Sequence, residues 1–320
     1  MMLSRVADTL YWMSRYLERA EHTARLLDLQ LHLMLELDPE ASEQRWERVV
    51  GSLYITVSPD LKRDAYSLTH LLAFDSSNVN SISACIAAAR ENARHVREQI
   101  SSEMWEQVNR LSLQVKSTQI SKIWDDQPHE FFRSVKEGIH LFQGITDSTM
   151  NHGEGWQFIQ MGRALERAIA TATLITVHYQ AYPDLVFQQT LNSTFMEWIG
   201  LLKSCTAFEA YCKVYTADLR PDRIAEFLIL NPEFPHSIRF CINSIHSSLQ
   251  AVAQSTESKR ARQINRLAGR LRAVLDYGQI DEIADNGLYA YLDDVQRQCH
   301  QIHDAIYSAY IAYPFEELVS

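Results

Sequence analysis

Apolar residues recur at steps of three and four along most of the chain. The first such stripe comprises Val6, Leu10, Met13, Leu17, Ala20, Ala24, Leu27 and Leu31. This spacing places apolar side chains on one face of an α-helix. No segment alternates polar and apolar residues for long, and ten glycines and eight prolines offer few turns for hairpins. The pattern predicts an all-α protein.

Turn-forming residues divide the helical pattern into separate segments. Ser4 is suited to cap the first helix, and Pro39 is expected to stop that helix after about 34 residues. The predicted fold is a multi-helix bundle of about twelve helices. The other helices are expected near residues 41–56, 60–74, 80–100, 101–119, 128–150, 154–181, 194–216, 221–230, 236–254, 257–277 and 287–312.

Two pairs of segments, each about half the chain apart, resemble each other. Six residues within 13–20 recur within 161–168 at a constant offset of 148 positions. The stretch "NSISACI" at 80–86 shares four residues in register with "HSIRFCI" at 236–242, at an offset of 156. The two matches keep the same order along the chain, which is the signature of an internal repeat.

We interpret these matches as an ancient duplication. The first helical repeat would occupy residues 1–150 and the second residues 151–320, with both packed as one compact unit. Convergent helical patterning stays open as the alternative, because helices draw on few residue types.

Each predicted repeat contains the pattern Arg-x-x-Glu-Arg in apolar surroundings. In the second copy, the three residues of this pattern are the only Asp, Glu, Lys or Arg residues between Trp156 and Tyr182, and a helix that is apolar all round is a buried helix. Buried charges need partners, because desolvation costs several kcal/mol per ion. We therefore expect the two helices to lie close about a pseudo-twofold axis and to share one buried network. Its members are Arg15, Glu18, Arg19, Arg163, Glu166 and Arg167.

Each triplet has more arginine than glutamate, which leaves a second interpretation open. The surplus positive charge suits a carboxylate or phosphate ligand, because arginine forms paired hydrogen bonds with such anions. In an enzyme, Glu18 or Glu166 would be the general base, and the neighbouring arginines would stabilise an oxyanion.

The segment "ARENARHVREQ" at 89–99 carries further arginines. Its Glu and Arg residues are spaced by three and four, which is typical of a salt-bridged helix surface. Arg90 and Arg94 are nevertheless the residues of this segment most suited to reach a shared site.

Charge and cysteine content narrow the classes of function. The 320 residues include 40 acidic and 30 basic ones, giving a formal charge of −10, which disfavours nucleic acid and anionic membranes as partners. Five cysteines without a CxxC spacing indicate neither a disulfide framework nor a zinc ribbon, so a reducing cytoplasm is expected. The uncharged stretch 168–183 is shorter than the roughly 20 residues that a membrane span needs.

Familiar cofactor and metal motifs are absent from the sequence. It contains no GxSxG, Walker loop, GxGxxG or HExxH motif, so no cofactor is expected. Glu137-x-x-His140 has no second copy, as a di-iron bundle would require. The cluster of Cys299, His300, His303 and Asp304 lacks a partner segment for four zinc ligands, so no metal site is expected either.

The opening "MLSRVADTLYWMSRYLERAEHTARLL" resembles that of the bacterial alpha-E proteins, a helical family named for a Glu-Arg pair, here Glu18-Arg19. The stretch "RENARHVREQISSEMWEQVN" at 90–109 and "FPHSIRFC" at 234–241 are similar to later blocks of that family. Two positions depart from the pattern: Ser14 stands where glycine is frequent, and His236 where arginine is common.

The resemblance implies a role rather than a reaction. Members of the family look like partners of circularly permuted ATP-grasp ligases and of transglutaminase-like proteins, sometimes fused to the ligase. The resemblance therefore predicts an accessory or substrate-presenting partner of an ATP-grasp ligase that makes or modifies peptide-like amides. The alternatives are an enzyme that forms or cleaves an amide at the Arg-Glu-Arg site, and a structural bundle that forms a homo-oligomer.

Overall fold

The computed structural model describes residues 2–34, 39–53, 55, 57–125, 128–181, 195–216, 218–254 and 259–311. Within these residues the chain forms fifteen α-helices and one π-helical turn at Tyr307–Ile311, and no strand. The prediction of an all-α, multi-helix bundle is confirmed. The helices are α1 (Ser4–Met34), α2 (Pro39–Ser52), α3 (Ala65–Ala73), α4 (Ile82–His95), α5 (Ser102–Ser117), α6 (Ile120–Asp125), α7 (Pro128–Thr149), α8 (Glu154–Ala181), α9 (Phe195–Ser204), α10 (Phe208–Tyr215), α11 (Pro221–Leu230), α12 (Ile238–Gln254), α13 (Lys259–Tyr277), α14 (Ile280–Asp285) and α15 (Leu288–Ile306).

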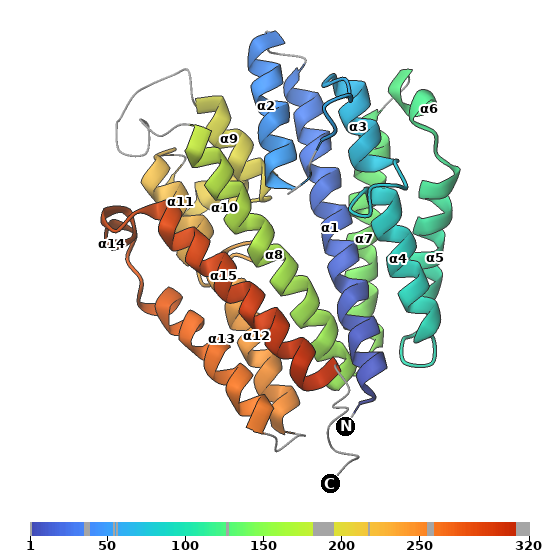
Figure 1. The fold of residues 1–320 in the computed structure, drawn as a ribbon, viewed down its shortest axis with the longest axis vertical. Helices are drawn as coiled ribbons and strands as arrows, with labels where there is room; N and C mark the ends of the chain where they lie inside the picture. The colour runs from blue at the N-terminus through green and yellow to red at the C-terminus, as the bar shows by residue number, and fades with distance from the viewer. Residues whose placement is uncertain are drawn as a thin grey trace.

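Eight of the helices form two groups of four that share a central contact. In the first group, α1 packs on α4 and α7, and α5 packs on the same two helices. In the second group, α8 packs on α12 and α15, and α13 packs on the same two. The long helices α1 and α8 pack along each other through the middle of the molecule and join the groups (Figure 1). Each long helix therefore faces its own group on one side and the other group's long helix on the other.

Local contacts at the matched sequence positions are also alike. The Ser81 hydroxyl accepts a hydrogen bond from the Ala84 amide at 3.2 Å, capping α4. The Ser237 hydroxyl accepts the corresponding bond from the Phe240 amide at 3.0 Å, at the start of α12. Matched caps and matched packing are what a duplicated unit would produce, and the duplication itself remains our inference.

Several helix boundaries differ from the predicted ones. The helix predicted at 194–216 is two helices, α9 and α10, because Thr206 adopts a φ of 52°, a left-handed conformation that cannot continue an α-helix. Pro39 is the first residue of α2, a position where proline's missing N–H is not needed. The six-residue helices α6 and α14 were not predicted. The predicted positions 54, 56, 194, 257, 258 and 312 lie outside the described residues.

A glycine permits the close approach of the two central helices. A Cβ atom added at Gly162 of α8 would overlap the Ser14 hydroxyl and the Tyr11 carbonyl of α1. The Ser14 hydroxyl donates to that carbonyl at 2.9 Å, which holds it against its own helix. Ser14 and Gly162 are matched positions of the two predicted repeats, so small residues from both helices meet at the contact that positions the charged groups.

None of the helices in the described ranges combines the length and the apolar character needed to cross a membrane.

Candidate functional site

The charged residues of α1 and α8 pair across the contact between these helices. Glu166 of α8 accepts hydrogen bonds from Arg15 Nε at 2.7 Å and from Arg19 Nε at 2.6 Å. Reciprocally, Glu18 of α1 accepts from Arg167 Nε at 2.5 Å and Nη2 at 3.0 Å. Each glutamate is therefore bound by arginine from the opposite helix, the shared network that the sequence pattern predicts.

These ion pairs are largely removed from water. The exposed fraction of the side chain is 3% for Glu18 and 14% for Arg167. Burial alone would raise the pKa of Glu166, but Arg15 and Arg19 together hold it below its usual value. The Glu166 carboxylate is therefore ionised at neutral pH, and hydrogen bonds from the two guanidinium groups compensate its burial.

Arg163 departs from the symmetric pattern. Its guanidinium donates to the Gln160 side chain of the same helix, and it forms no ion pair within the described part of the chain. Burial, followed by the charge of Arg167, lowers its pKa. Arg163 therefore adds positive charge near Glu18 without holding that carboxylate directly.

A second ring of contacts fixes the arginines. Arg19 Nη1 donates to Asn80 Oδ1 at 2.6 Å, and Arg167 Nη1 donates to the Pro235 carbonyl at 3.2 Å. Asn80 and the neighbour of Pro235, His236, occupy matched positions of the two predicted repeats. The N-terminal ends of α4 and α12 thus support the two Glu-Arg pairs in the same way.

Arg15 is held on its other side by aromatic groups. Its guanidinium lies 4.7 Å from the Trp12 ring centroid, and its Nη1 lies 3.2 Å from Nδ1 of His303. The Tyr11 hydroxyl is 2.9 Å from the same His303 nitrogen. His303 of α15 therefore contacts the arginine network. This role differs from that of a zinc ligand, for which the sequence analysis considered the same residue.

A cavity of about 690 Å³ lies at the contact between α1 and α8. This volume is within the range of small-molecule sites. Its wall combines charged groups with an apolar part formed by Leu53, Ile169, Ala170 and Leu174. The polar and charged residues that line it are Arg15, Glu18, Arg19, His22, Arg25, Ser52, Asn80, Glu166, Arg167, Thr171, Thr173, Ser204, Cys205, His236, Asp293, Gln296, Arg297 and His300.

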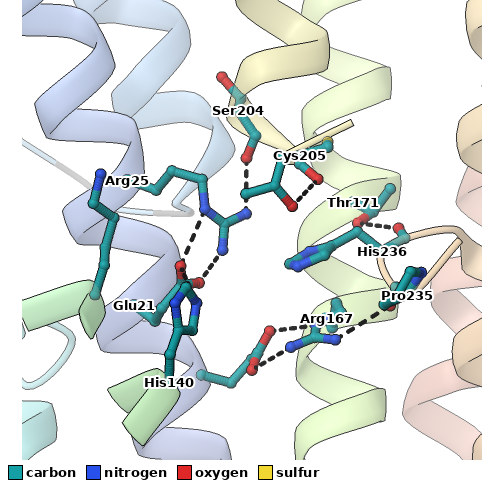
Figure 2. Close-up of polar contacts among 12 residues, drawn as sticks. Glu21, Arg25, His140, Arg167, Thr171, Ser204, Cys205, Pro235 and His236 are labelled. Atoms are coloured by element: carbon teal, nitrogen blue, oxygen red, sulfur yellow. Dashed lines mark hydrogen bonds and ion pairs between the residues drawn. The ribbon is translucent and has the colours of Figure 1, made fainter. Parts of the chain in front are cut away.

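Arg25 also lines the cavity, and it pairs with the buried Glu21 of the same helix. Arg25 donates from Nε to Glu21 Oε1 at 3.2 Å and from Nη1 to the Ser204 carbonyl at 3.0 Å (Figure 2). Glu21 is 1% exposed. Burial would raise the pKa of Glu21, but Arg25 and then His140 lower it to about 2. Spacing of four along a helix occurs in both exposed and buried ion pairs, so the sequence alone could not separate them.

The net charge of the arginines and glutamates around the cavity is positive. Four arginines outnumber three glutamates, and the exposed pair Asp293 and Arg297 at the rim adds no net charge. The four arginines are Arg15, Arg19, Arg25 and Arg167, and the three glutamates are Glu18, Glu21 and Glu166.

Two neutral histidines face the same space. His22 is buried, and its Nε2 has no hydrogen-bond partner among the described residues. Burial, and then Arg25, lowers the pKa of His22 to about 4. The half-buried His236 points its ring between Arg25 and Arg167 (Figure 2), and burial lowers its pKa well below the usual value. At pH 7 each ring can donate one N–H and accept one hydrogen bond.

Cys205 is the cysteine that lines the cavity. Burial raises the pKa of its thiol to about 12. The reactive form of cysteine is the thiolate, so this group is a poor nucleophile near neutral pH.

Arg90 and Arg94 do not reach the site, so their assignment to it was wrong. Arg90 donates to Asn109 Oδ1 of α5 at 2.7 Å, and Arg94 pairs with Glu91 on the surface. The face of α4 that packs on α1 carries its apolar residues instead, which turns these two arginines away from the cavity.

Comparison with known proteins places these features in a family. Residues 2–311 match Alpha-E, which is described as a predicted alpha-helical domain with a conserved ER motif. Of the three Glu-Arg pairs in the sequence, Glu18-Arg19 and Glu166-Arg167 line the cavity, whereas Glu47-Arg48 does not.

The chain is also similar to longer mycobacterial proteins. An uncharacterized protein of Mycobacterium bovis and two of Mycobacterium tuberculosis strains are each 22% identical to it over 346 aligned positions, covering 97% of this chain. The alignment covers only 37% of each relative's length. No solved structure matches the chain. By the match over residues 2–311, the chain belongs to the Alpha-E family.

Proposed function

We propose that the protein binds a small, peptide-like carboxylate in the cavity between α1 and α8 and presents it to an ATP-grasp amide ligase. The observation that carries the binding step is the surplus of arginine over glutamate around the cavity. Guanidinium groups bind carboxylates through paired, charge-assisted hydrogen bonds, and a monoanion would neutralise the surplus.

His22 supports the binding of a polar ligand. A buried nitrogen without a partner costs about 1–3 kcal/mol. His22 lines the cavity, and its buried Nε2 atom has no hydrogen-bond partner among the described residues. A ligand that hydrogen-bonds this nitrogen removes the cost on binding, so the unpaired atom favours an occupied cavity. The apolar wall of Leu53, Ile169, Ala170 and Leu174 suits the hydrocarbon part of such a ligand.

We prefer binding to catalysis because the candidate bases are already engaged. A general base works best when its pKa lies near the working pH. The pKa of Glu166 is lowered instead, and both of its oxygens accept hydrogen bonds from arginine. Both oxygens of Glu18 are bound by Arg167. These groups are arranged to hold arginines in place rather than to take up a proton.

The ligase partner is proposed from the family resemblance and from the length of the relatives. Because the chain spans only 37% of the mycobacterial proteins, each of them has room for at least one further domain. A ligase domain fused to a binding module meets the bound ligand at high effective concentration. A separate ligase would meet the ligand by forming a complex with the binding protein. Presentation of the ligand to a ligase would use either arrangement.

The binding step is tested by isothermal titration calorimetry with N-acetyl-alanyl-alanine and with its C-terminal amide. The two probes differ in one charge, so we expect the acid to bind at least about tenfold more tightly, a difference of 1.4 kcal/mol. Equal affinities for acid and amide, or binding of neither, would contradict the proposal.

A cavity-filling variant tests the location. Ala170→Leu adds bulk to the cavity wall without removing a charged group, and we expect it to abolish acid binding. Ala251→Leu makes the same change on an exposed position of α12 and should leave affinity unchanged. If both variants bind like the wild type, the ligand site lies elsewhere.

The partner step has a separate test. The purified protein is mixed with the ATP-grasp ligase of the same genome and N-acetyl-alanyl-alanine, and ATP turnover and complex formation are measured. We expect a complex and a faster turnover that Ala170→Leu abolishes. Without either effect the partner step fails, while the binding step stands on the calorimetry.

A further inference from the structure

Three potential metal ligands converge beside the cavity, where α1 packs on α7. Asp28 and His32 are one helical turn apart on α1, and His129 lies in the first turn of α7. His129 Nδ1 is 2.8 Å from Asp28 Oδ1, and His32 Nδ1 is 4.0 Å from the same oxygen. The ligand atoms of the three residues all lie within 4.8 Å of one another. The convergence was not expected from the sequence, because Asp28 and His129 are 101 positions apart.

The two imidazole rings of the cluster lie close together. The ring centroids of His32 and His129 are 3.8 Å apart. A divalent cation would use the lone pairs of both rings together with the carboxylate, which is a common donor set for Zn²⁺.

The geometry requires only a small adjustment to hold such an ion. Zinc bonds of about 2.0–2.1 Å in a tetrahedral site place ligand atoms about 3.3 Å apart. The His32 side chain is 62% exposed, which leaves room for it to move nearer to the other two in exchange for the 3.3 Å contact of its Nδ1 with the Asp28 carbonyl. A hollow of about 300 Å³ leaves space for water beside Asp28 and His32, and its lining also includes Arg25, Lys136 and Lys203 but not His129.

Lys136 fits this arrangement as a neighbour of the carboxylate. Its Nζ lies 2.5 Å from Asp28 Oδ2, whereas both histidines approach Oδ1. Lysine therefore occupies the oxygen that faces away from the histidines and orients the carboxylate, as outer-shell groups do around metal ligands.

We propose that Asp28, His32 and His129 bind one Zn²⁺ ion, with water completing the coordination, and that the ion joins α1 to α7. This site is separate from the cavity between α1 and α8, and it does not depend on the proposed ligand. Zinc rather than magnesium is favoured because two of the three donors are imidazole nitrogens, whereas magnesium prefers oxygen.

Calorimetric titration of the untagged, full-length protein with ZnCl₂ tests the proposal. We expect one ion per chain and a rise in Tm with Zn²⁺ but not with MgCl₂. His32→Ala and His129→Ala should each lower the affinity at least about tenfold, the loss that even outer-shell changes cause. Both histidines are partly exposed, so circular dichroism should show the same fold in each variant.

His95→Ala is the matched control. His95 lies 3.3 Å from Glu91 with the same spacing of four residues, but this pair belongs to no group of three ligands in the described part of the chain. The control should bind zinc like the wild type. The proposal is overturned if the wild type binds no zinc, or if zinc binding survives both His32→Ala and His129→Ala.

Discussion

At the scale of single residues, the central feature is that Glu18 and Glu166 each depend on arginine from the other helix. Glu166 receives two guanidinium groups, and its side chain is 12% exposed. Breaking a buried ion pair on one side leaves an uncompensated charge, which costs more than the intact pair contributes. Removing one of these glutamates is therefore expected to destabilise the protein more than the small net contribution of an intact ion pair would suggest.

We predict that Glu166→Gln destabilises the fold by about 3–5 kcal/mol, because Arg15 and Arg19 lose their shared counter-charge. Urea unfolding followed by circular dichroism measures this change. Glu91→Gln removes a carboxylate from the exposed pair with Arg94 and should change stability far less, because solvent screens an exposed ion pair. Similar effects of the two substitutions would show that the Glu166 pairs are not shielded from water.

The buried histidine His22 predicts a loss of stability in acid. Its pKa is lowered to about 4 in the folded protein from an ordinary value of 6.5, so the unfolded chain binds the proton more readily between these values. Its contribution is complete above pH 6.5 and is lost as the pH falls toward 4. We expect His22 alone to account for about 2 kcal/mol between pH 7 and pH 5.

Urea unfolding at both pH values checks this prediction by comparison with His22→Gln, which does not titrate. The variant should lose less stability between pH 7 and pH 5 than the wild type. Other histidines with lowered pKa values, such as His178 and His303, remain in both proteins and cancel in the comparison. An equal loss in the two proteins would mean that His22 is accessible to protons when folded.

At the scale of helices, capping chemistry predicted boundaries where the chain carries it locally. Pro221 begins α11 and the helix at 154–181 has its predicted ends. The break at Thr206 had no such signal, because the residue with the left-handed φ is neither glycine nor proline. Local sequence therefore predicted well where helices form, but poorly where a helix is interrupted.

The contact between α1 and α8 depends on one missing side chain. We predict that Gly162→Ala destabilises the protein by about 1–3 kcal/mol, because the new Cβ meets the Ser14 hydroxyl and the Tyr11 backbone. Gly144→Ala on α7 is the control: nothing lies within 4 Å of the added atom, and alanine is the better helix former by roughly 0.5–1 kcal/mol. Thermal melts should shift in opposite directions. Equal upward shifts would mean that the two helices can separate at no cost.

At the scale of the whole molecule, the sequence predicted the paired charges but not the full cavity. The repeated Arg-x-x-Glu-Arg pattern stood out because its second copy lies in an apolar helix. Glu21, His22 and Arg25 were missed because a polar stripe has the same spacing whether it faces water or another helix. Which of the two it faces depends on the position of α9, and Ser204 at the end of that helix is far away in the sequence.

The same reciprocal pairing predicts how the two groups of helices unfold. A chain of 320 residues often unfolds in steps, yet separation of the groups here would strand Glu18 and Arg167 on opposite surfaces, as well as Glu166 and its arginines. We therefore expect one cooperative transition, in which the amides of α5 and α13 lose their protection from hydrogen exchange at the same urea concentration. In Glu166→Gln the coupling is weaker, and the two helices should lose protection at different concentrations. Separate transitions already in the wild type would contradict the coupling, since the ion pairs would then fail to hold the groups together.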